Sequence, residues 1–290
     1  MTIYNLGSIN ADYFYHLPHL PKPGETLAAT DMSRGLGGKG ANMSVAAARA
    51  GAHVCHIGSV GQDGGWAVER MMEYGVDTRH IVTADVATGN AVIMVDDAGE
   101  NAIVLLPGAN HAIGKNVIGA ALAEASPNDT LLIQNETNNQ AYAARLGRDM
   151  GMRVAYAAAP FDAAKVQEVL PYLEYLFLNE VEAEQLHQAT GQNPASLPVS
   201  KVFVTMGAKG CVLFDNDAGQ TFEYPALPVK AVDTTGAGDT FTGYVLAALG
   251  RGMPMAQAIA LATRAGALMV MREGTADAIP DLKDVQDARF

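Results

Sequence analysis

A carboxylate at the start of an expected helix stands out in residues 231–243, which read AVDTTGAGDTFTG. Glycine lets a backbone approach a ligand closely, and the free N–H groups of a helix start attract negative charge. We therefore expect Gly236, Ala237 and Gly238 to form an anion hole. A carboxylate beside a phosphate needs a chemical task, so Asp239 is expected to take a proton from a hydroxyl that attacks the phosphate. Alternatively, Asp239 only caps the helix and the glycines only shape a turn.

Two hydroxyls and a second carboxylate crowd the same turn, in Asp233, Thr234 and Thr235. Oxygen donors grouped in this way can hold a hard cation. A nucleotide is the other ligand that this turn could hold. Both interpretations favour ligand binding over a turn that is purely structural.

A second glycine loop, RGLGGKGAN (34–42), also satisfies the Gly-x-Gly-x-x-Gly pattern. As a dinucleotide fingerprint it is weak, because the preceding AATDMS is not the apolar strand that the motif requires. It is not a phosphate-binding P-loop either, since Gly40 rather than Ser or Thr follows Lys39. Lys39 and Asn42 instead lie at the mouth of an expected Ala-rich helix, where they suit hydroxyl groups. An NAD-dependent oxidoreductase remains the alternative function, and tight NAD binding would identify it.

The elements that must position these residues alternate along the chain. Short apolar runs alternating with helical patterns are typical of parallel βαβ units with right-handed crossovers. We therefore expect an α/β fold with a doubly wound, mostly parallel sheet flanked by helices. The expected strands include 53–60, 130–134, 154–158, 175–179 and 201–205, and the expected helices lie near 64–74, 115–125, 137–149, 181–189, 239–249 and 254–270.

Two stretches break this alternation. Residues 90–106 read as two β-rich segments around Asp-Asp-Ala-Gly-Glu, which indicates a hairpin. Residues 3–38 contain a second excursion of this kind. Together they predict a small antiparallel β lid, with segments at about 10–38 and 90–108, beside a single domain that spans 1–290.

Composition and charge exclude several partners. The net charge of −12 and the absence of a Lys/Arg run argue against nucleic acid. No apolar run approaches the ~20 residues of a membrane span, and the N-terminus lacks the features of a signal peptide. Cys55 and Cys211 lie in apolar stretches and read as reduced core thiols, which suits the cytoplasm.

The motifs in their order along the chain resemble the ribokinase-like (pfkB) family of carbohydrate kinases. Each motif alone is only suggestive, whereas nine of them in the family's order cover nearly the whole chain. They are GSINAD (7–12), PKPGET (21–26), GGKGAN (37–42), GQDGGW (61–66), PGAN (107–110), QNE (134–136), NEVEAE (179–184), TMGAKG (205–210) and DTTGAGDTFTG (233–243).

The resemblance assigns roles to the matching positions. The residues that it implies bind the sugar hydroxyls are Asn10, Asp12, Gly38, Lys39, Asn42, Glu136 and Asp239. Asp239 is also implied to be the catalytic base. ATP falls to Asn179, Thr205, Gly207, Gly210 and Gly238. Glu182 is implied to bind Mg²⁺ through a water molecule. Asp233 and Thr235, with the turn near 272–274, are implied to bind a monovalent cation, K⁺.

The activity that the resemblance implies is transfer of the γ-phosphoryl group of MgATP to a primary hydroxyl of a small sugar, with D-ribose as the first expectation. The alternatives within the family are a nucleoside, a ketohexose or a keto-deoxy sugar acid, and a non-catalytic sugar sensor is a further one. By analogy with the family, the lid implies a homodimer, because a second copy could cover its edges and its apolar face.

The chain departs from the family pattern in two places. Residues 191–200 form a short connection where an outer helix is usual, so that helix is expected to be missing or reduced. The run Tyr13-Phe14-Tyr15 follows Asp12 and is bulky beside a small pentose. One ring could stack on a larger sugar or on a base, or the rings could pack in a dimer.

Overall fold

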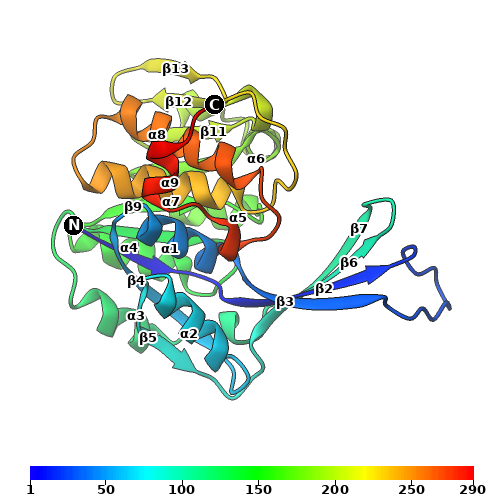
Figure 1. Cartoon of the computed structure of the whole chain (residues 1–290). Helices are drawn as coiled ribbons and strands as arrows, with labels where there is room; N and C mark the ends of the chain where they lie inside the picture. The colour runs from blue at the N-terminus through cyan, green and yellow to red at the C-terminus, as the bar shows by residue number, and fades with distance from the viewer.

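The computed structural model describes residues 1–290 and has a three-layer α/β architecture (Figure 1). Its nine-stranded sheet has the order β13-β12-β11-β10-β9-β8-β1-β4-β5. All strands from β5 to β11 in this order run parallel, and β12 and β13 add an antiparallel edge. The strands are β1 (Thr2–Leu6), β4 (His53–Val60), β5 (Asp77–Thr83), β8 (Thr130–Gln134), β9 (Arg153–Ala157), β10 (Tyr175–Asn179), β11 (Lys201–Thr205), β12 (Cys211–Asp215) and β13 (Gln220–Tyr224).

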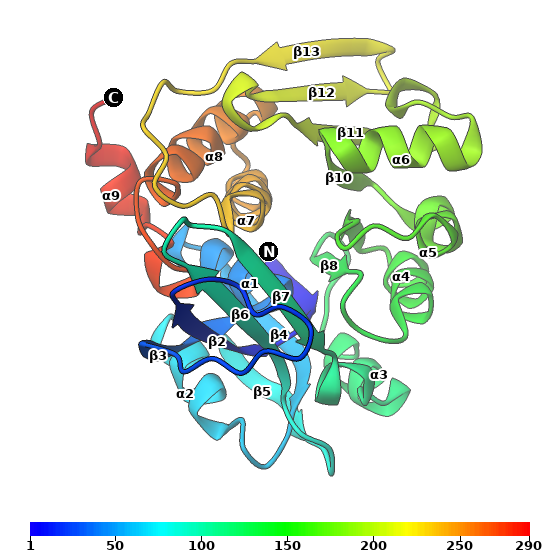
Figure 2. The same ribbon diagram turned by 90° about the vertical axis from the view of Figure 1, so that its right-hand side faces the viewer.

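Helices cover both faces of this sheet, as the turned view in Figure 2 shows. One core lies under α1, α2, α7, α8 and α9, and the other lies under α3 to α6. The central strands, such as β8 and β10, are apolar runs because both of their faces are buried. The helices are α1 (Lys39–Arg49), α2 (Gly65–Glu73), α3 (Lys115–Leu122), α4 (Gln140–Asp149), α5 (Ala163–Val169), α6 (Glu180–Thr190), α7 (Ala237–Gly250), α8 (Met255–Met269) and α9 (Leu282–Asp287).

The predicted doubly wound sheet is therefore confirmed, and its winding reverses between β1 and β8. The chain builds β4 and β5 on one side of β1 and then returns to place β8 on the other side. Ligands in such sheets bind outside the carboxyl ends of the strands at the reversal point. The residues that follow β1 and β8 are therefore where a site is expected.

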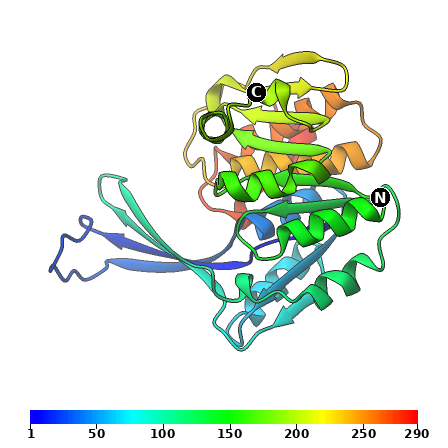
Figure 3. The same cartoon turned by 180° about the vertical axis from the view of Figure 1, so that it is seen from behind.

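A four-stranded lid projects from the side of the main sheet where the carboxyl ends of the parallel strands lie (Figures 1 and 3). Its order is β3-β2-β6-β7, with β2 (Asn10–Leu17), β3 (Asp31–Gly37), β6 (Gly89–Asp96) and β7 (Asn101–Leu106). The expectation of an antiparallel lid is corrected in one respect, because the central strands β2 and β6 pair in parallel. Both strands leave the same edge of the main sheet and run outward, and each returns as an antiparallel hairpin.

The lid is fastened to the body at its base. The Arg34 guanidinium of β3 lies 4.2 Å from the ring centroid of Trp66 on α2, which is a cation–π contact. On the other side of the base, the Thr275 hydroxyl donates a 2.7 Å hydrogen bond to the Leu36 carbonyl. These contacts hold β3 where it leads into α1.

The shortened connection between α6 and β11 carries no α-helix. Its only helical element is a 3₁₀ turn over Pro194–Ser196, so the outer helix is reduced, as expected from the short connection. No helix of the structure is long and apolar enough to cross a bilayer.

Candidate active site

Residues from distant segments meet at the reversal point, just beyond β1 and β8. The Glu136 carboxylate accepts hydrogen bonds from the Ser8 hydroxyl and, at 3.0 Å, from the backbone N–H of Lys39. Ser8 follows β1, Glu136 follows β8, and Lys39 opens α1. One carboxylate thus ties together the three segments that surround the site.

Asn10, at the start of β2, is held by a second asparagine. Its Oδ1 accepts a 2.8 Å hydrogen bond from Asn110 Nδ2, and Asn110 Oδ1 accepts one from the Ile9 N–H. Asn10 is buried and keeps its own amide N–H groups for a ligand. Asn110 ends the PGAN motif (107–110), but the sequence indicated no role for it, and its only signal there was an asparagine in a glycine turn.

Asp12 points into the same region from β2 and is 6% exposed. Burial, together with the negative charge of Glu136 nearby, raises the pKa of the Asp12 carboxyl to about 7. Gly37 makes room for it, because a Cβ atom there would lie 1.9 Å from a carboxylate oxygen of Asp12. The carboxylate therefore lies in a recess that the neighbouring strand leaves open.

Gly38 turns the chain from the lid into α1. Its φ of +91° favours glycine, and a Cβ atom there would come within 3.0 Å of the backbone of Ser8 and Asn10. We call Asn10, Asp12, Asn42 and Glu136, which surround this turn, the switch-point cluster.

Asp239 occupies the first turn of α7 with its side chain free of any capping hydrogen bond. Gly236 is the N-cap residue, with a φ of +74°. The Asp239 Oδ2 atom accepts a 2.9 Å hydrogen bond from Asn42 Nδ2, and Asp239 is only 7% exposed. The alternative in which Asp239 merely caps the helix is wrong, because its carboxylate turns toward the switch-point cluster instead.

The backbone of this turn differs in one detail from the expected anion hole. The Ala237 N–H is used internally, since it donates to the Thr234 carbonyl at 3.3 Å. Gly238 and Asp239 follow as first-turn residues whose N–H groups have no helical partner. These two N–H groups are the donors that an anion would meet.

Lys39 links the carboxylates of the region. The negative charge of Asp239 is the largest cause that raises the pKa of the Lys39 ammonium, and Glu136 and Glu182 add to it against the opposing effect of burial. A cation among carboxylates, beside a helix start, suits a ligand that brings several negative charges of its own.

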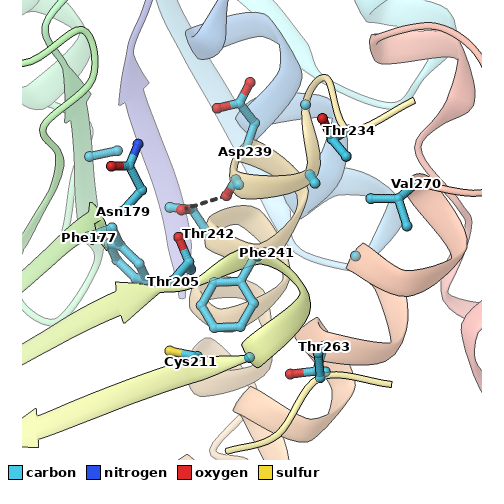
Figure 4. A pocket seen from close by; sticks show the side chains of 18 of the residues that line it. Phe177, Asn179, Thr205, Cys211, Thr234, Asp239, Phe241, Thr242, Thr263 and Val270 are labelled. Atoms are coloured by element: carbon cyan, nitrogen blue, oxygen red, sulfur yellow. Dashed lines mark hydrogen bonds between the residues drawn. The ribbon is translucent and has the colours of Figure 1, made fainter. Parts of the chain in front are cut away.

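A cavity of about 530 Å³ is lined by Asp239 but by no residue of the switch-point cluster (Figure 4). The predicted residues on its wall are Lys39, Asn179, Glu182, Thr205, Gly207, Gly210, Gly236, Ala237, Gly238 and Asp239. We call it the main cavity. The switch-point cluster does not line it, and neither do Asp233 and Thr235. Lys39 and Asp239 thus lie where the two regions meet.

Much of the main cavity is apolar and was not predicted. Phe177 and Phe241 face it from β10 and α7, and Cys211 faces it from β12. The end of α8 and the segment after β13 complete the wall with Ala226, Leu227, Val229, Ala231, Thr263, Gly266, Ala267 and Val270. Their signal in the sequence was a run of small residues on α8, which is equally typical of helix packing.

Asn179 and Glu182 form a capping box at the start of α6. Asn179 Oδ1 accepts from the Glu182 N–H, and Glu182 Oε2 accepts from the Asn179 N–H, both at 2.8 Å. Glu182 is buried rather than on a solvated helix face, and this burial is the main cause that raises the pKa of its carboxyl. Only one of its two oxygens serves the cap, so the other remains for a ligand.

Asp233 joins the turn before α7 to the turn after α8. Its Oδ1 accepts from the Thr235 N–H at 2.8 Å, and its Oδ2 accepts from the Gly274 N–H at 3.2 Å. The expected neighbours of a monovalent cation are therefore together. A carboxylate held in place by two N–H groups, beside the threonine of the same turn, is compatible with a hard cation that needs few anionic ligands. No group of three or more His, Cys, Asp or Glu side chains has metal-site geometry.

The dinucleotide interpretation of residues 34–42 is wrong. Gly35 and Gly37 lie within the lid strand β3, where they pair with Asp12 and Asn10 of β2. Their spacing of two is the period of a β-strand, and it places both glycines on one face.

Comparison with known proteins agrees with this architecture. The profile of the pfkB family carbohydrate kinases matches residues 3–282. The ribokinase of Haemophilus influenzae is 36% identical, over 96% of this chain and 95% of that protein. The ribokinase of Bacillus subtilis is 32% identical, over 97% of each.

Solved structures are similar over almost the whole chain. The ribokinase of Thermotoga maritima superposes with a TM-score of 0.89 at 31% identity, covering 99% of this chain and 98% of that one. The ribokinase of Arabidopsis thaliana, complexed with ribose and ATP, has a TM-score of 0.85 at 27% identity, covering 98% and 97%. With a family profile that spans nearly the whole sequence, this chain belongs to the pfkB family of carbohydrate kinases.

Proposed function

We propose that this protein is an ATP-dependent sugar kinase that converts D-ribose to ribose 5-phosphate. The observation that carries the proposal is the position of Asp239. Its carboxylate makes no helix-capping hydrogen bond, and the residue lines the main cavity. The same carboxylate accepts a hydrogen bond from Asn42 of the switch-point cluster. A base at such a junction can touch a hydroxyl on one side and a phosphoryl group on the other. The similarity to ribokinases, one of them solved with ribose and ATP, supports the substrate assignment.

The chemistry follows from these positions. The sugar lies in the switch-point cluster, and ATP lies in the main cavity with its phosphates toward α7. Asp239 accepts the proton of the primary hydroxyl, whose oxygen attacks the γ-phosphorus while ADP leaves; general base catalysis of this kind contributes typically ~10²–10⁴ in rate. The N–H groups of Gly238 and Asp239 and the Lys39 ammonium stabilise the charge on the transferring group.

Glu182 is proposed to place Mg²⁺ through a water molecule with its free carboxylate oxygen. Bound Mg²⁺ would neutralise phosphate charge. Asp233 and Thr235, with the turn at 272–274, are proposed to hold K⁺. The Asp233 carboxylate is fixed by N–H groups from both turns, so a cation there would order the approach to the Gly236–Gly238 turn.

We further propose that the chain works as one kinase domain in a cytoplasmic homodimer that forms through the lid. Apolar side chains of β7 are exposed on the lid: Ile103, Val104, Leu105 and Leu106, at 55%, 60%, 57% and 49%. These consecutive residues alternate between the two faces of the lid and lie on its edge strand, where a second copy could cover them. Cys55 and Cys211 are both buried and unpaired, in keeping with a reducing compartment.

ADP release from MgATP tests the proposal on a panel of ribose, other pentoses, fructose, keto-deoxygluconate and nucleosides, each in K⁺ and in Na⁺ buffer. Fastest turnover on ribose, with stimulation by K⁺, is expected. Faster turnover on another acceptor would keep the kinase and refute the substrate. Sugar binding without any turnover would refute the kinase and favour the sensor.

A further inference from the structure

The three aromatic residues that follow Asp12 face opposite sides of the lid. Side chains alternate along a strand, and β2 pairs regularly with β3 and β6 from Asn10 to His16. Phe14 therefore shares the face of Asp12 and Asn10, whereas Tyr13 and Tyr15 lie on the other face. Only Phe14 is on the side of the switch-point cluster.

The Phe14 ring also leans toward the cluster. A Cβ atom built on Gly35, the register partner of Asp12, would lie 3.9 Å from Phe14 Cε2. Asp12 leans in the same direction, over Gly37, the partner of Asn10. The two side chains thus bend one step inward along the strand, and the two glycines give them room.

Successive rows across this face of the lid differ in character. The innermost row carries Asn10 between Gly37 and Gly89. The second row carries Asp12 between Gly35 and Ala91, small residues that leave a recess around the carboxylate.

The third row carries Phe14 between Ser33 and Ile93, so its apolar part is Phe14 with Ile93. It begins two residues, about 7 Å, beyond Asp12, a distance comparable with the span of one sugar ring. A polar floor, an open recess and an apolar wall therefore follow one another outward along the lid.

We infer that Phe14 determines acceptor specificity as the outer wall of the sugar site. The ring limits the site to an unsubstituted monosaccharide and excludes acceptors in which the sugar carries a base, such as a nucleoside. It touches the non-polar side of the sugar while Asp12 binds hydroxyls. This inference rests on the proposed function, whose sugar site it deepens.

The test is the ratio of kcat/KM for inosine to kcat/KM for ribose, measured by ADP release in the full-length protein. Phe14→Ala removes the wall and is expected to raise this ratio at least about tenfold, the usual scale for a change of pocket size. Phe14→Leu keeps apolar bulk and should give an intermediate ratio. Tyr15→Ala, which removes an aromatic ring from the other face of the same strand, should leave the ratio unchanged.

The KM for ATP and the melting temperature of each variant show whether the body of the protein is intact. An unchanged ratio in both Phe14 variants, with ribose turnover retained, would overturn the inference alone. A wild-type preference for inosine that Phe14→Ala abolishes would also overturn it, because the ring would then be a stacking platform. If the wild-type protein phosphorylates none of the acceptors, the proposed function itself fails.

Discussion

The switch-point cluster and the main cavity meet at Asp239 but are built in different ways. The cluster consists of polar side chains from β2, α1 and the end of β8 that are held by hydrogen bonds to their neighbours, such as Asn42 to Asp239 and Asn110 to Asn10. The cavity is walled largely by apolar side chains and glycine turns, with Phe177, Phe241 and Val270 on its surface. We therefore expect one region to recognise its ligand by paired polar groups and the other to recognise its ligand by shape.

The difference teaches where each region is vulnerable. A buried polar group that loses its partner costs about 1–3 kcal/mol, and more when it is charged. An apolar wall that loses a single contact with its ligand gives up only ~0.1–0.2 kcal/mol for each pair of heavy atoms. Substitutions in the cluster are therefore expected to cost far more activity than equally small substitutions in the cavity.

The largest effect is expected from Asp239→Asn, at the junction itself. The amide keeps the size of the side chain but cannot accept the hydroxyl proton, so kcat on ribose should fall by about 10²–10⁴. Steady-state ADP release measures this, with ribose binding by calorimetry to show that the site is intact. Asp149→Asn, an exposed carboxylate on α4, is the matched control. If the kcat of this variant stays within about threefold of the wild-type value, Asp239 is not the catalytic base.

Asp12→Asn should act next most strongly, and on KM rather than kcat. A hydrogen bond to a charged group contributes about 1.5–3 kcal/mol, so the KM for ribose should rise by about 10- to 150-fold. The KM for ATP should stay within about twofold if the two regions recognise their ligands independently. A parallel rise in both KM values would break the comparison.

The raised pKa of Asp12, about 7, gives this residue two opposite pH effects. Because the folded-state pKa lies above the ordinary value near 4, the ligand-free fold binds the extra proton, and its stability falls as pH rises from about 4 to about 7. The cost reaches at most about 4 kcal/mol and is constant above that range.

If ribose binds to the ionised Asp12 carboxylate, as proposed, the KM should rise as pH falls below about 7. Thermal melts and KM values from pH 5 to 8 measure the two trends. Asp12→Asn should flatten both trends. If the melting temperature of this variant depends on pH as steeply as that of the wild type, the assignment of the raised pKa to Asp12 is contradicted.

Glu182→Gln should have an intermediate effect and separates the cap from the cation. Glutamine serves in a capping box as glutamate does, so the unfolding free energy should change by less than about 0.5 kcal/mol. A role in placing Mg²⁺ predicts a several-fold higher Mg²⁺ concentration for half-maximal activity. Glu184→Gln, on the exposed side of α6, is the control. Equal Mg²⁺ curves for wild type and Glu182→Gln would leave Glu182 with a structural role only.

The smallest effect is expected from Thr263→Val in the cavity wall. The threonine hydroxyl lines the cavity without a hydrogen-bond partner in the protein. Recognition by shape predicts a change in the KM for ATP of less than about threefold, which corresponds to under 1 kcal/mol. A tenfold rise would show that the cavity also selects by polar groups and would weaken the contrast between the regions.

The sequence predicted the central elements well because of a simple physical pattern. Strands such as β8 and β10 are buried on both faces and therefore read as unbroken apolar runs. β5 is only half-buried and β13 is mostly exposed, so their patterns are mixed and the sequence did not indicate them, whereas the apolar stretch around Cys211 in β12 did read as a strand. The parallel pairing at the centre of the lid could not be read either, since it depends on where two distant segments leave the main sheet.

The candidate site was predicted as a set of residues but not as a set of contacts. Motif order brought Asn42 and Asp239 into one site, yet their hydrogen bond joins positions 197 apart and appears only in the fold. The glycines of β3 match part of a nucleotide-binding pattern because that pattern coincides with strand spacing, and the missing apolar strand before them already made the match weak. The Asn179–Glu182 pair was readable as a capping box, and that structural task is independent of any cation.

The contact between Arg34 and Trp66 gives the protein an optical reporter of its lid. Trp66 is the only tryptophan in the chain, and a charged guanidinium lies 4.2 Å from its ring centroid. Arg34 belongs to β3, which carries the two glycines beneath Asp12 and Phe14. A shift of the lid on sugar binding would move the cation across the indole and change the fluorescence of a single chromophore, so the motion can be timed without any label.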